Sequence, residues 1–354
     1  GDRRWPLRLV FTLPMRVLVE QVERTLRGWV DRLRELAGAD HGADSVAIHV
    51  LMGGVRTESW HLFPERPAIL IGTQDMILSR ALCRGFGAAR GRWPMDFALL
   101  NHDALWVLDE IQLMDVGLTT SVQLAAFRDA DSPRTRRAVA DRPCHCWWMS
   151  ATLQTDWLGH GAEAGALVAG LGERMVTVPE TARSGAPWDI AKRASRRSDI
   201  DSAEQVAELA AREHTPGTLS LVIVNRVDRA VAVFAALDGL LSEGSGKKRR
   251  RRDDAPDVRL IHSRFRGAER AAWADAGAEP DVGGFLRGDA DVSGAGRILV
   301  ATQVVEAGVD ISARLLISDL APWASLVQRA GRAGRRERDR GARIIVVRAR
   351  MVAG

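Results

Sequence analysis

The sequence predicts an α/β protein built from two tandem units, and three observations lead to this prediction. Short apolar segments typical of strands alternate with longer helical segments, an order that favours parallel sheets flanked by helices. The alternation is lost between about residues 178 and 203, where Pro179, Gly185 and Pro187 stand among polar residues, and then restarts. A length of 354 residues also suits two domains of ordinary size. We therefore predict a first unit at 1–178, a linker at 179–202 and a second unit at 203–354.

In the first unit, a short apolar run precedes a long helical pattern, and further strand-like runs follow at intervals. The expected strands are Leu7–Leu13, Val46–Leu51, Ala68–Gly72, Ala104–Leu108 and His145–Ser150, and the long helix is Arg16–Leu36. In the second unit, the expected helices are Ala203–Arg212 and Asp228–Leu241, and the expected strands are Leu219–Val224, Arg259–His262, Arg297–Ala301, Leu315–Ile317 and Arg343–Val347. Strand alternating with helix in both halves predicts one parallel sheet in each unit.

The composition is that of a globular protein, with 46% hydrophobic and 27% charged residues. No apolar run approaches the roughly 18 residues of a membrane span, so we expect no membrane contact. The 3 cysteines are too few for a disulfide framework, which favours the reducing cytoplasm. The net charge of +5 comes from the run Lys247–Arg252, because without it acidic residues outnumber basic ones by one. That run is either a solvated loop or a contact to a nucleic-acid backbone or a partner.

The segment Val107–Gln112 places two adjacent carboxylates, Asp109 and Glu110, directly after an apolar strand. The carboxyl ends of parallel strands are where α/β proteins bind ligands. In nucleotide hydrolases, the first carboxylate of such a pair holds Mg²⁺ and the second polarises the attacking water. A solvated strand end is the alternative interpretation of this pair taken alone.

The segment Gln328–Arg335 has three arginines spaced three residues apart with glycines between them. Glycine lets the backbone approach a ligand closely, and the planar guanidinium matches phosphate oxygens. The alternative, an exposed basic helix end, is less favoured because glycine is a poor helix former. The pattern therefore predicts a phosphate-binding segment.

Further short motifs end strands in hydroxyl, amide or charged residues, and their order along the chain is informative. The set comprises Leu13–Arg16, Gly72–Asp75, Asp109–Gln112, Ser150–Thr152, Val224–Arg226, Thr302–Asp310 and Gln328–Arg335. This order resembles the superfamily 2 helicases over nearly the whole chain. Leu13–Gln21, His102, Ile261–Phe265 and Ala321–Trp323 further resemble one subgroup, the CRISPR-associated helicase–nuclease of type I systems.

The resemblance implies two RecA-like domains with a nucleotide cleft between them, and ATP and Mg²⁺ as cofactors. Asp109 would hold Mg²⁺, Glu110 would activate the water, and Gln328 would position it. Arg332 and Arg335 would be arginine fingers, worth about 10³–10⁵ in rate in other NTPases. The residues implied to contact the nucleotide or couple its hydrolysis to domain movement are Gln112, Ser150, Thr152, Gly308 and Asp310.

The resemblance also implies an ATP-dependent translocase or helicase core that acts on single-stranded DNA in CRISPR interference. Contacts to the strand would be independent of its sequence. The residues implied for them are Pro14, Arg16, Thr73, Asn225, His262, Ser263, Arg264 and Thr302. The implied partners are a crRNA-guided surveillance complex and a His-Asp nuclease domain located elsewhere in the full protein or on a separate chain.

Two departures from the family pattern bear on activity. Gln112 stands where histidine is common; glutamine can still bridge to the second domain but cannot carry a proton. No Gly-x-x-x-x-Gly-Lys-Ser/Thr phosphate loop surrounds any of the lysines, Lys192, Lys247 and Lys248. We therefore expect a fragment that lacks its phosphate loop and is itself deficient in ATPase activity. The alternatives are a nucleotide-independent nucleic-acid-binding or scaffold module, and an RNA helicase or restriction-type translocase of the same superfamily.

Overall fold

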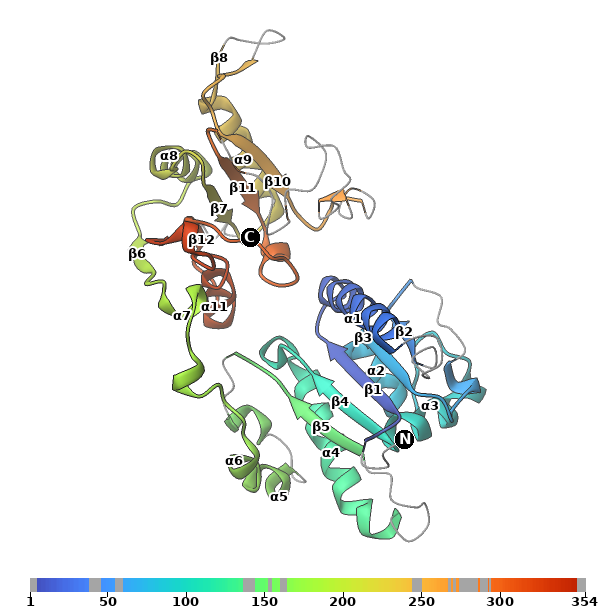
Figure 1. The fold of residues 1–354 in the computed structure, drawn as a ribbon. Helices are drawn as coiled ribbons and strands as arrows, with labels where there is room; N and C mark the ends of the chain where they lie inside the picture. Colours follow the sequence, from blue (N-terminus) through green and yellow to red (C-terminus); the bar gives the residue numbers. More distant parts are fainter. Residues whose placement is uncertain are drawn as a thin grey trace, which may run out of the picture. The chain divides into compact units, whose positions relative to one another are not determined.

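The computed structural model describes residues 5–37, 46–54, 60–135, 144–151, 155–159, 164–243, 250–266, 269, 272–273, 286, 292 and 294–348. The chain divides into two compact units, Gly1–Thr177 and Val178–Gly354. Each unit holds a parallel sheet flanked by helices, which confirms the predicted α/β architecture (Figure 1).

In the described part of the first unit, five parallel strands lie in the order β2-β3-β1-β4-β5. Their bounds are β1 Arg8–Leu13, β2 Ala47–Leu51, β3 Ala68–Thr73, β4 Ala104–Leu108 and β5 Cys144–Trp148. The helices are α1 Arg16–Ala37, α2 Gln74–Ala81, α3 Trp93–Asn101, α4 Val116–Thr135, α5 Ala164–Ala169 and α6 Leu171–Arg174. The central strand β1 alternates between fully buried and half-buried side chains, as expected for a strand covered on both faces. The hydrophobic core of the first unit includes Val10, Leu70, Trp106 and Leu108.

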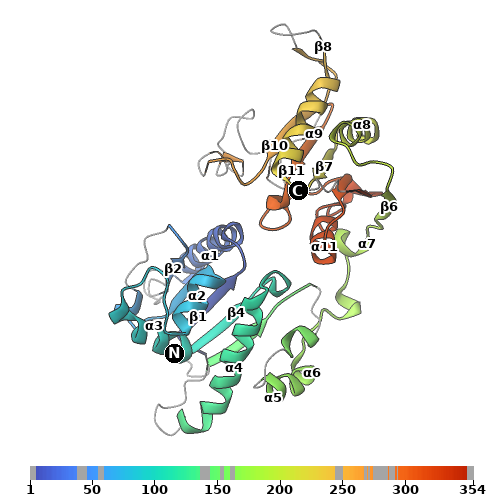
Figure 2. The same cartoon turned by 180° about the vertical axis from the view of Figure 1, so that it is seen from behind.

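In the described part of the second unit, six parallel strands lie in the order β10-β11-β7-β12-β13-β6. The helix Val227–Leu240 lies against β10 and β11 (Figure 2). Their bounds are β6 Arg193–Arg197, β7 Leu219–Ile223, β10 Asp257–Ile261, β11 Arg297–Ala301, β12 Leu315–Asp319 and β13 Arg343–Val347. The helices are α7 Ala186–Asp189, α8 Ala203–Glu213, α9 Val227–Leu240 and α11 Trp323–Ala330, and a short hairpin joins β8 Ser242–Glu243 to β9 Arg250–Arg251. All five side chains of β7 are buried, and separate apolar clusters cover the two faces of the sheet.

The structure differs from the sequence prediction in the segment 179–202, which was expected to be a linker. Residues Arg193–Arg197 form β6, the edge strand that pairs in parallel with β13. The strand escaped prediction because its sequence, RASRR, is almost wholly exposed and carries no apolar pattern. Backbone pairing, with Arg193 N donating to Ala342 O at 3.1 Å, holds it instead.

The strand registers bring the motif residues of each unit to one edge of its sheet. In the first unit, Leu13 is level with Thr73, Thr12 with Leu108, and Leu108 with Trp148. In the second unit, Ala301 is level with both Ile261 and Ile223. Because parallel strands end on the same side, the residues that follow them share that side.

Candidate functional site

The acidic pair follows β4 in a tight, unusual backbone turn. Glu110 adopts the left-handed conformation, with φ 52° and ψ 45°, which costs a non-glycine residue roughly 1–2 kcal/mol. Two contacts hold it: Glu110 N donates to Asp109 Oδ1 at 2.8 Å, and Ile111 N donates to Met149 O at 3.2 Å. Strained backbone of this kind concentrates at functional sites, so the turn supports a functional assignment for the pair.

A chain of side-chain hydrogen bonds leads from Glu110 to the end of the next strand. Gln112 Nε2 donates to Glu110 Oε2 at 2.5 Å, and Ser150 Oγ donates to Gln112 Oε1 at 2.7 Å. Gln112 therefore joins the segment after β4 to the segment after β5 within one unit. Thr152, which we expected beside Ser150, lies outside the described residues.

Asp109 is partly buried, and both burial and the neighbouring Glu110 charge raise its pKa, although the hydrogen bond from Glu110 N opposes the rise. A carboxylate whose ionised form is disfavoured, such as that of Asp109, suits a bound divalent cation. Within the described residues, no group of three or more His, Cys, Asp or Glu side chains could hold a metal ion. Mg²⁺ usually takes one or two protein carboxylates and completes its shell with phosphate and water, so Asp109 stays the residue expected to hold it.

The residues expected to contact nucleic acid in the first unit lie together. Thr73 ends β3 and precedes α2, level with Leu13, while Pro14 and Arg16 lead from β1 into α1. Arg16 is exposed, and Pro14 and Thr73 are half-buried. The Thr73 side chain makes no capping hydrogen bond to α2.

The second unit gathers the arginine segment around the loop that follows β11. Arg332 donates to backbone oxygens, from Nε and Nη2 to Glu306 O at 3.1 and 2.6 Å and from Nη1 to Val309 O at 2.5 Å. Arg335 Nη1 donates to Asp310 Oδ1 at 3.3 Å. Gly308 has φ 73°, a conformation that favours glycine. These hydrogen bonds hold the loop after β11 and the arginine segment together.

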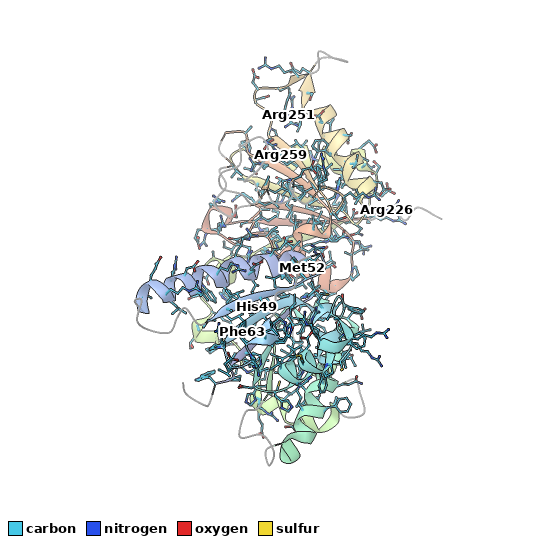
Figure 3. The ribbon with its side chains drawn as sticks, turned by 90° about the vertical axis from the view of Figure 1, so that its right-hand side faces the viewer. His49, Met52, Phe63, Arg226, Arg251 and Arg259 are labelled. Atoms are coloured by element: carbon cyan, nitrogen blue, oxygen red, sulfur yellow. The ribbon has the colours of Figure 1, made fainter. Side chains whose placement is uncertain are left out.

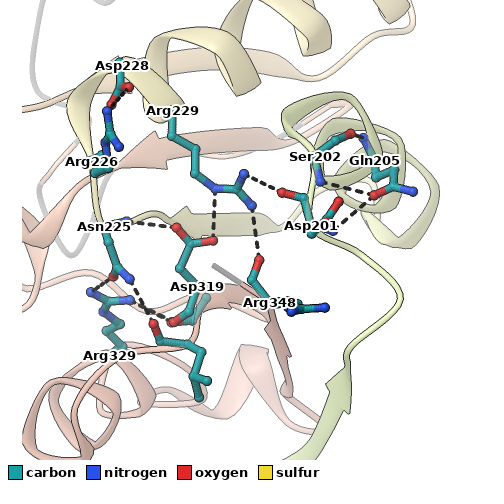
Figure 4. Close-up of polar contacts among 12 residues, drawn as sticks. Asp201, Ser202, Gln205, Asn225, Arg226, Asp228, Arg229, Asp319, Arg329 and Arg348 are labelled. Carbon is teal, nitrogen blue, oxygen red and sulfur yellow. Dashed lines mark hydrogen bonds and ion pairs between the residues drawn. The ribbon is translucent and has the colours of Figure 1, made fainter. Parts of the chain in front are cut away.

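Arg329, the first of the three arginines of the predicted phosphate-binding segment, is buried and hydrogen-bonded within its own unit (Figure 4). It is 3% exposed, and its Nε donates to Glu306 Oε1 at 2.7 Å. Its Nη1 donates to Ser318 Oγ at 3.0 Å and its Nη2 to Asn225 Oδ1 at 2.9 Å. The sequence signal that could have found it is its place directly after Gln328, as the first of three arginines spaced three residues apart. Gln328 itself is half-buried on α11.

Lys192, which no phosphate-loop motif surrounds, lies beside the arginine segment. Its Nζ donates to Ala330 O at 3.2 Å, at the end of α11. Burial and the charge of Arg335 lower its pKa. A cation at a helix carboxyl end is favourable, so Lys192 supports the start of the arginine loop.

The remaining residues expected to bind nucleic acid differ in accessibility. Ser263 and Arg264 are exposed after β10, and the His262 ring lies 4.5 Å from the Phe265 ring centre to centre. Burial and the Arg264 charge lower the pKa of His262. Thr302 is 1% exposed, so its hydroxyl faces the interior, in contrast to the expected contact with a phosphate.

The described part of the basic run is neutralised by nearby carboxylates. Arg250 pairs with Asp253 at 2.7 Å, and Arg251, labelled in Figure 3, pairs with Asp238 at 3.2 Å. Lys247, Lys248 and Arg249 lie outside the described residues. Among the residues that the structure does describe, no helix is long and apolar enough to cross a membrane.

Comparison with known proteins shows which family the chain resembles. Residues 216–338 match the family model of the CRISPR-associated nuclease/helicase Cas3, C-terminal. The CRISPR-associated endonuclease/helicase Cas3 of Thermus thermophilus is 31% identical over 332 residues, which cover 81% of this chain and 33% of that protein. The chain belongs to the Cas3 family. It spans about a third of the length of the T. thermophilus Cas3 that it matches.

Solved structures show the same fold. T. fusca Cas3 with AMPPNP superposes with a TM-score of 0.58 at 19% identity, covering 97% of this chain and 41% of that chain. The DUF1998 helicase MrfA bound to DNA has a TM-score of 0.59 at 18% identity, covering 97% and 42%. The fold predicted from the sequence, with two parallel α/β units in tandem, is therefore confirmed.

Proposed function

We propose that this chain is the helicase core of a Cas3 protein, which hydrolyses ATP to move along single-stranded DNA in type I CRISPR interference. The observation that carries the proposal is the hydrogen-bond chain from Glu110 through Gln112 to Ser150. A carboxylate that activates water must be held in place, and this chain fixes Glu110 while tying it to the end of the next strand.

The roles of the first-unit residues follow from their surroundings. Asp109 would hold Mg²⁺, which when bound neutralises phosphate charge and orients the phosphoryl group. Glu110, held by Gln112, would orient the attacking water and accept its proton. Burial and the neighbouring Glu110 charge raise the pKa of Asp109, so a cation beside it would relieve an unfavourable negative charge.

In the second unit, Gln328 would position the water, and Arg332 and Arg335 would stabilise the charge that develops on the phosphate. Both arginines already have oxygen partners, namely the Glu306 and Val309 carbonyls and the Asp310 carboxylate. They would exchange some of these partners for phosphate oxygens when ATP binds. Gly308 and Asp310 would then lie at the nucleotide edge.

Single-stranded DNA would contact residues that follow the β-strand ends. These are chiefly Arg16 and Thr73 in the first unit and Ser263 and Arg264 in the second. These supply a charge, hydroxyls and backbone N–H groups, which contact phosphates whatever the sequence. A related chain appears in a structure described as a CRISPR RNA-guided surveillance complex before nicking, with a TM-score of 0.53. We propose the same class of partner here, together with a nuclease domain.

The test is ATPase activity of the protein expressed from its complete reading frame, with and without single-stranded DNA. We expect stimulation by DNA and a loss of at least about 10²-fold in Glu110→Gln. Glu173→Gln, an exposed change in the same unit, is the matched control and should behave as wild type. No DNA-stimulated hydrolysis by the wild-type protein, or full activity in Glu110→Gln, would refute the proposal.

A further inference from the structure

We infer that Asn225, Glu306 and Arg329 form a positioning network that fixes α11 and its catalytic side chains, and that Asn225 acts through Arg329 rather than by contacting DNA. This inference rests on the proposed function. It concerns the residue after β7 that the family resemblance assigns to the nucleic acid.

The first step is the burial of Arg329 and its counterion. Glu306 is 6% exposed and Arg329 is 3% exposed, with 2.7 Å between Nε and Oε1. Arg329 Nη1 also donates to Asp319 O at 3.1 Å, in addition to the Ser318 and Asn225 oxygens. A planar guanidinium that serves acceptors in several directions fixes its own orientation. It therefore also fixes the rotation of α11 about its axis.

The second step is that the polar groups of Asn225 are committed within their own unit. Asn225 N donates to Asp319 Oδ2 at 3.0 Å, and Nδ2 donates to Leu320 O at 2.8 Å. The amide oxygen accepts from Arg329. Asp319 is itself held by Arg229, whose Nε donates to Oδ1 at 3.2 Å (Figure 4). The Asn225 amide group is left with its second Nδ2 hydrogen, so a phosphate contact would have to use that hydrogen in the orientation these bonds fix, or displace one of them.

The third step is where the network leads. It joins the end of β7 (Asn225), the loop after β11 (Glu306) and the end of β12 (Ser318 and Asp319) to α11. Gln328 precedes Arg329 on this helix, and Arg332 follows shortly after the helix end at Ala330. A shift of Arg329 would move both residues relative to Asp310. The network thus positions residues proposed to act on ATP, although one of its members lies where DNA contacts were expected.

Two substitutions of Asn225 distinguish a contact with DNA phosphate from a role in positioning Arg329. Asn225→Asp keeps an acceptor for Arg329 but adds a negative charge, whereas Asn225→Ala removes the acceptor. A residue touching phosphate should tolerate alanine better than aspartate, because like charges repel. A residue positioning Arg329 should tolerate aspartate better than alanine.

The experiment uses the protein from its complete reading frame. Affinity for fluorescein-labelled oligo-dT is measured by anisotropy, and the kcat of ATP hydrolysis is measured at saturating DNA. We expect the Kd for DNA in both variants to stay within about threefold of wild type. The kcat should fall at least about fivefold in Asn225→Ala and less in Asn225→Asp. Arg329→Lys keeps the positive charge but loses the planar guanidinium, so its kcat should fall as in Asn225→Ala. Arg340→Ala, at an exposed pair with Glu337, is the control.

Two outcomes would overturn the inference: a Kd weakened at least about tenfold in Asn225→Asp and more than in Asn225→Ala, or an unchanged kcat in Asn225→Ala. Failure of the wild-type protein to bind DNA or hydrolyse ATP would count against the proposed function instead. In that case hydrogen exchange decides the inference. The amides of Trp323–Gly331 should exchange at least about tenfold faster in Asn225→Ala, and equal rates would overturn it.

Discussion

Replacing Arg329 by methionine should destabilise the second unit strongly, because it leaves a buried carboxylate without its counterion. The Glu306 side chain is only 8% exposed, and Arg329 is its ion-pair partner at 2.7 Å. Removing one member of a buried pair costs about 3–5 kcal/mol. For a unit of the size of Val178–Gly354, about 2–4 °C of melting temperature correspond to each kcal/mol. The expected loss in Arg329→Met is therefore roughly 6–20 °C.

The measurement is differential scanning calorimetry of the full chain, comparing the single variant with the double variant Glu306→Gln/Arg329→Met. The double variant removes both charges, so it should recover a substantial part of the loss. Arg340→Ala, which breaks an exposed pair, should leave the transition unchanged. A single variant that melts within about 2 °C of wild type would show that the pair is solvated and that our energetic argument is wrong.

Two further predictions concern the first unit. Gly72→Ala should lower stability by about 1–3 kcal/mol, measured by thermal melting, because its Cβ would lie 2.3 Å from Leu51 O on the neighbouring strand; an unchanged melting temperature would contradict this. Asp109→Asn should raise the melting temperature at pH 7 and have no such effect below pH 3.8, the ordinary pKa of the carboxyl. The sign follows because a raised pKa in the folded state gives stability at low pH that is lost as the pH rises through that pKa. An equal gain in melting temperature at both pH values would contradict a raised pKa for Asp109.

The parallel sheets could be predicted because their central strands are apolar on both faces, as in Leu219–Ile223. The edge strand Arg193–Arg197 could not, because a strand held by backbone pairing on one side needs no apolar pattern. The hairpin of Ser242–Glu243 with Arg250–Arg251 was likewise missed. Its strands are two residues long and charged, so no periodicity can identify them.

The candidate site shows a similar division. The position of Asp109 and Glu110 after a strand could be predicted, because an apolar run followed by two carboxylates is visible in the sequence. The partners of Arg329 could not, since Asn225, Glu306 and Ser318 lie 104, 23 and 11 residues away in sequence. The inward orientation of Thr302 is also a tertiary property, set by how the strand end packs.

The two units use the same physical arrangement at their sheet edges. In the first unit, the Gln112 amide joins the Glu110 carboxylate to Ser150, after the end of β5. In the second unit, the Asn225 amide joins Arg329, the counterion of Glu306, to Leu320, after the end of β12. An amide donates and accepts at once, so rotating it breaks both bonds together. A change in the partners of Glu110 must therefore be felt at Ser150, and a change at Asn225 must be felt at Arg329. Gln112→Glu and Asn225→Asp each lose the donor and keep the acceptor, so the bonds to Glu110 and Leu320 should be lost while those from Ser150 and Arg329 remain.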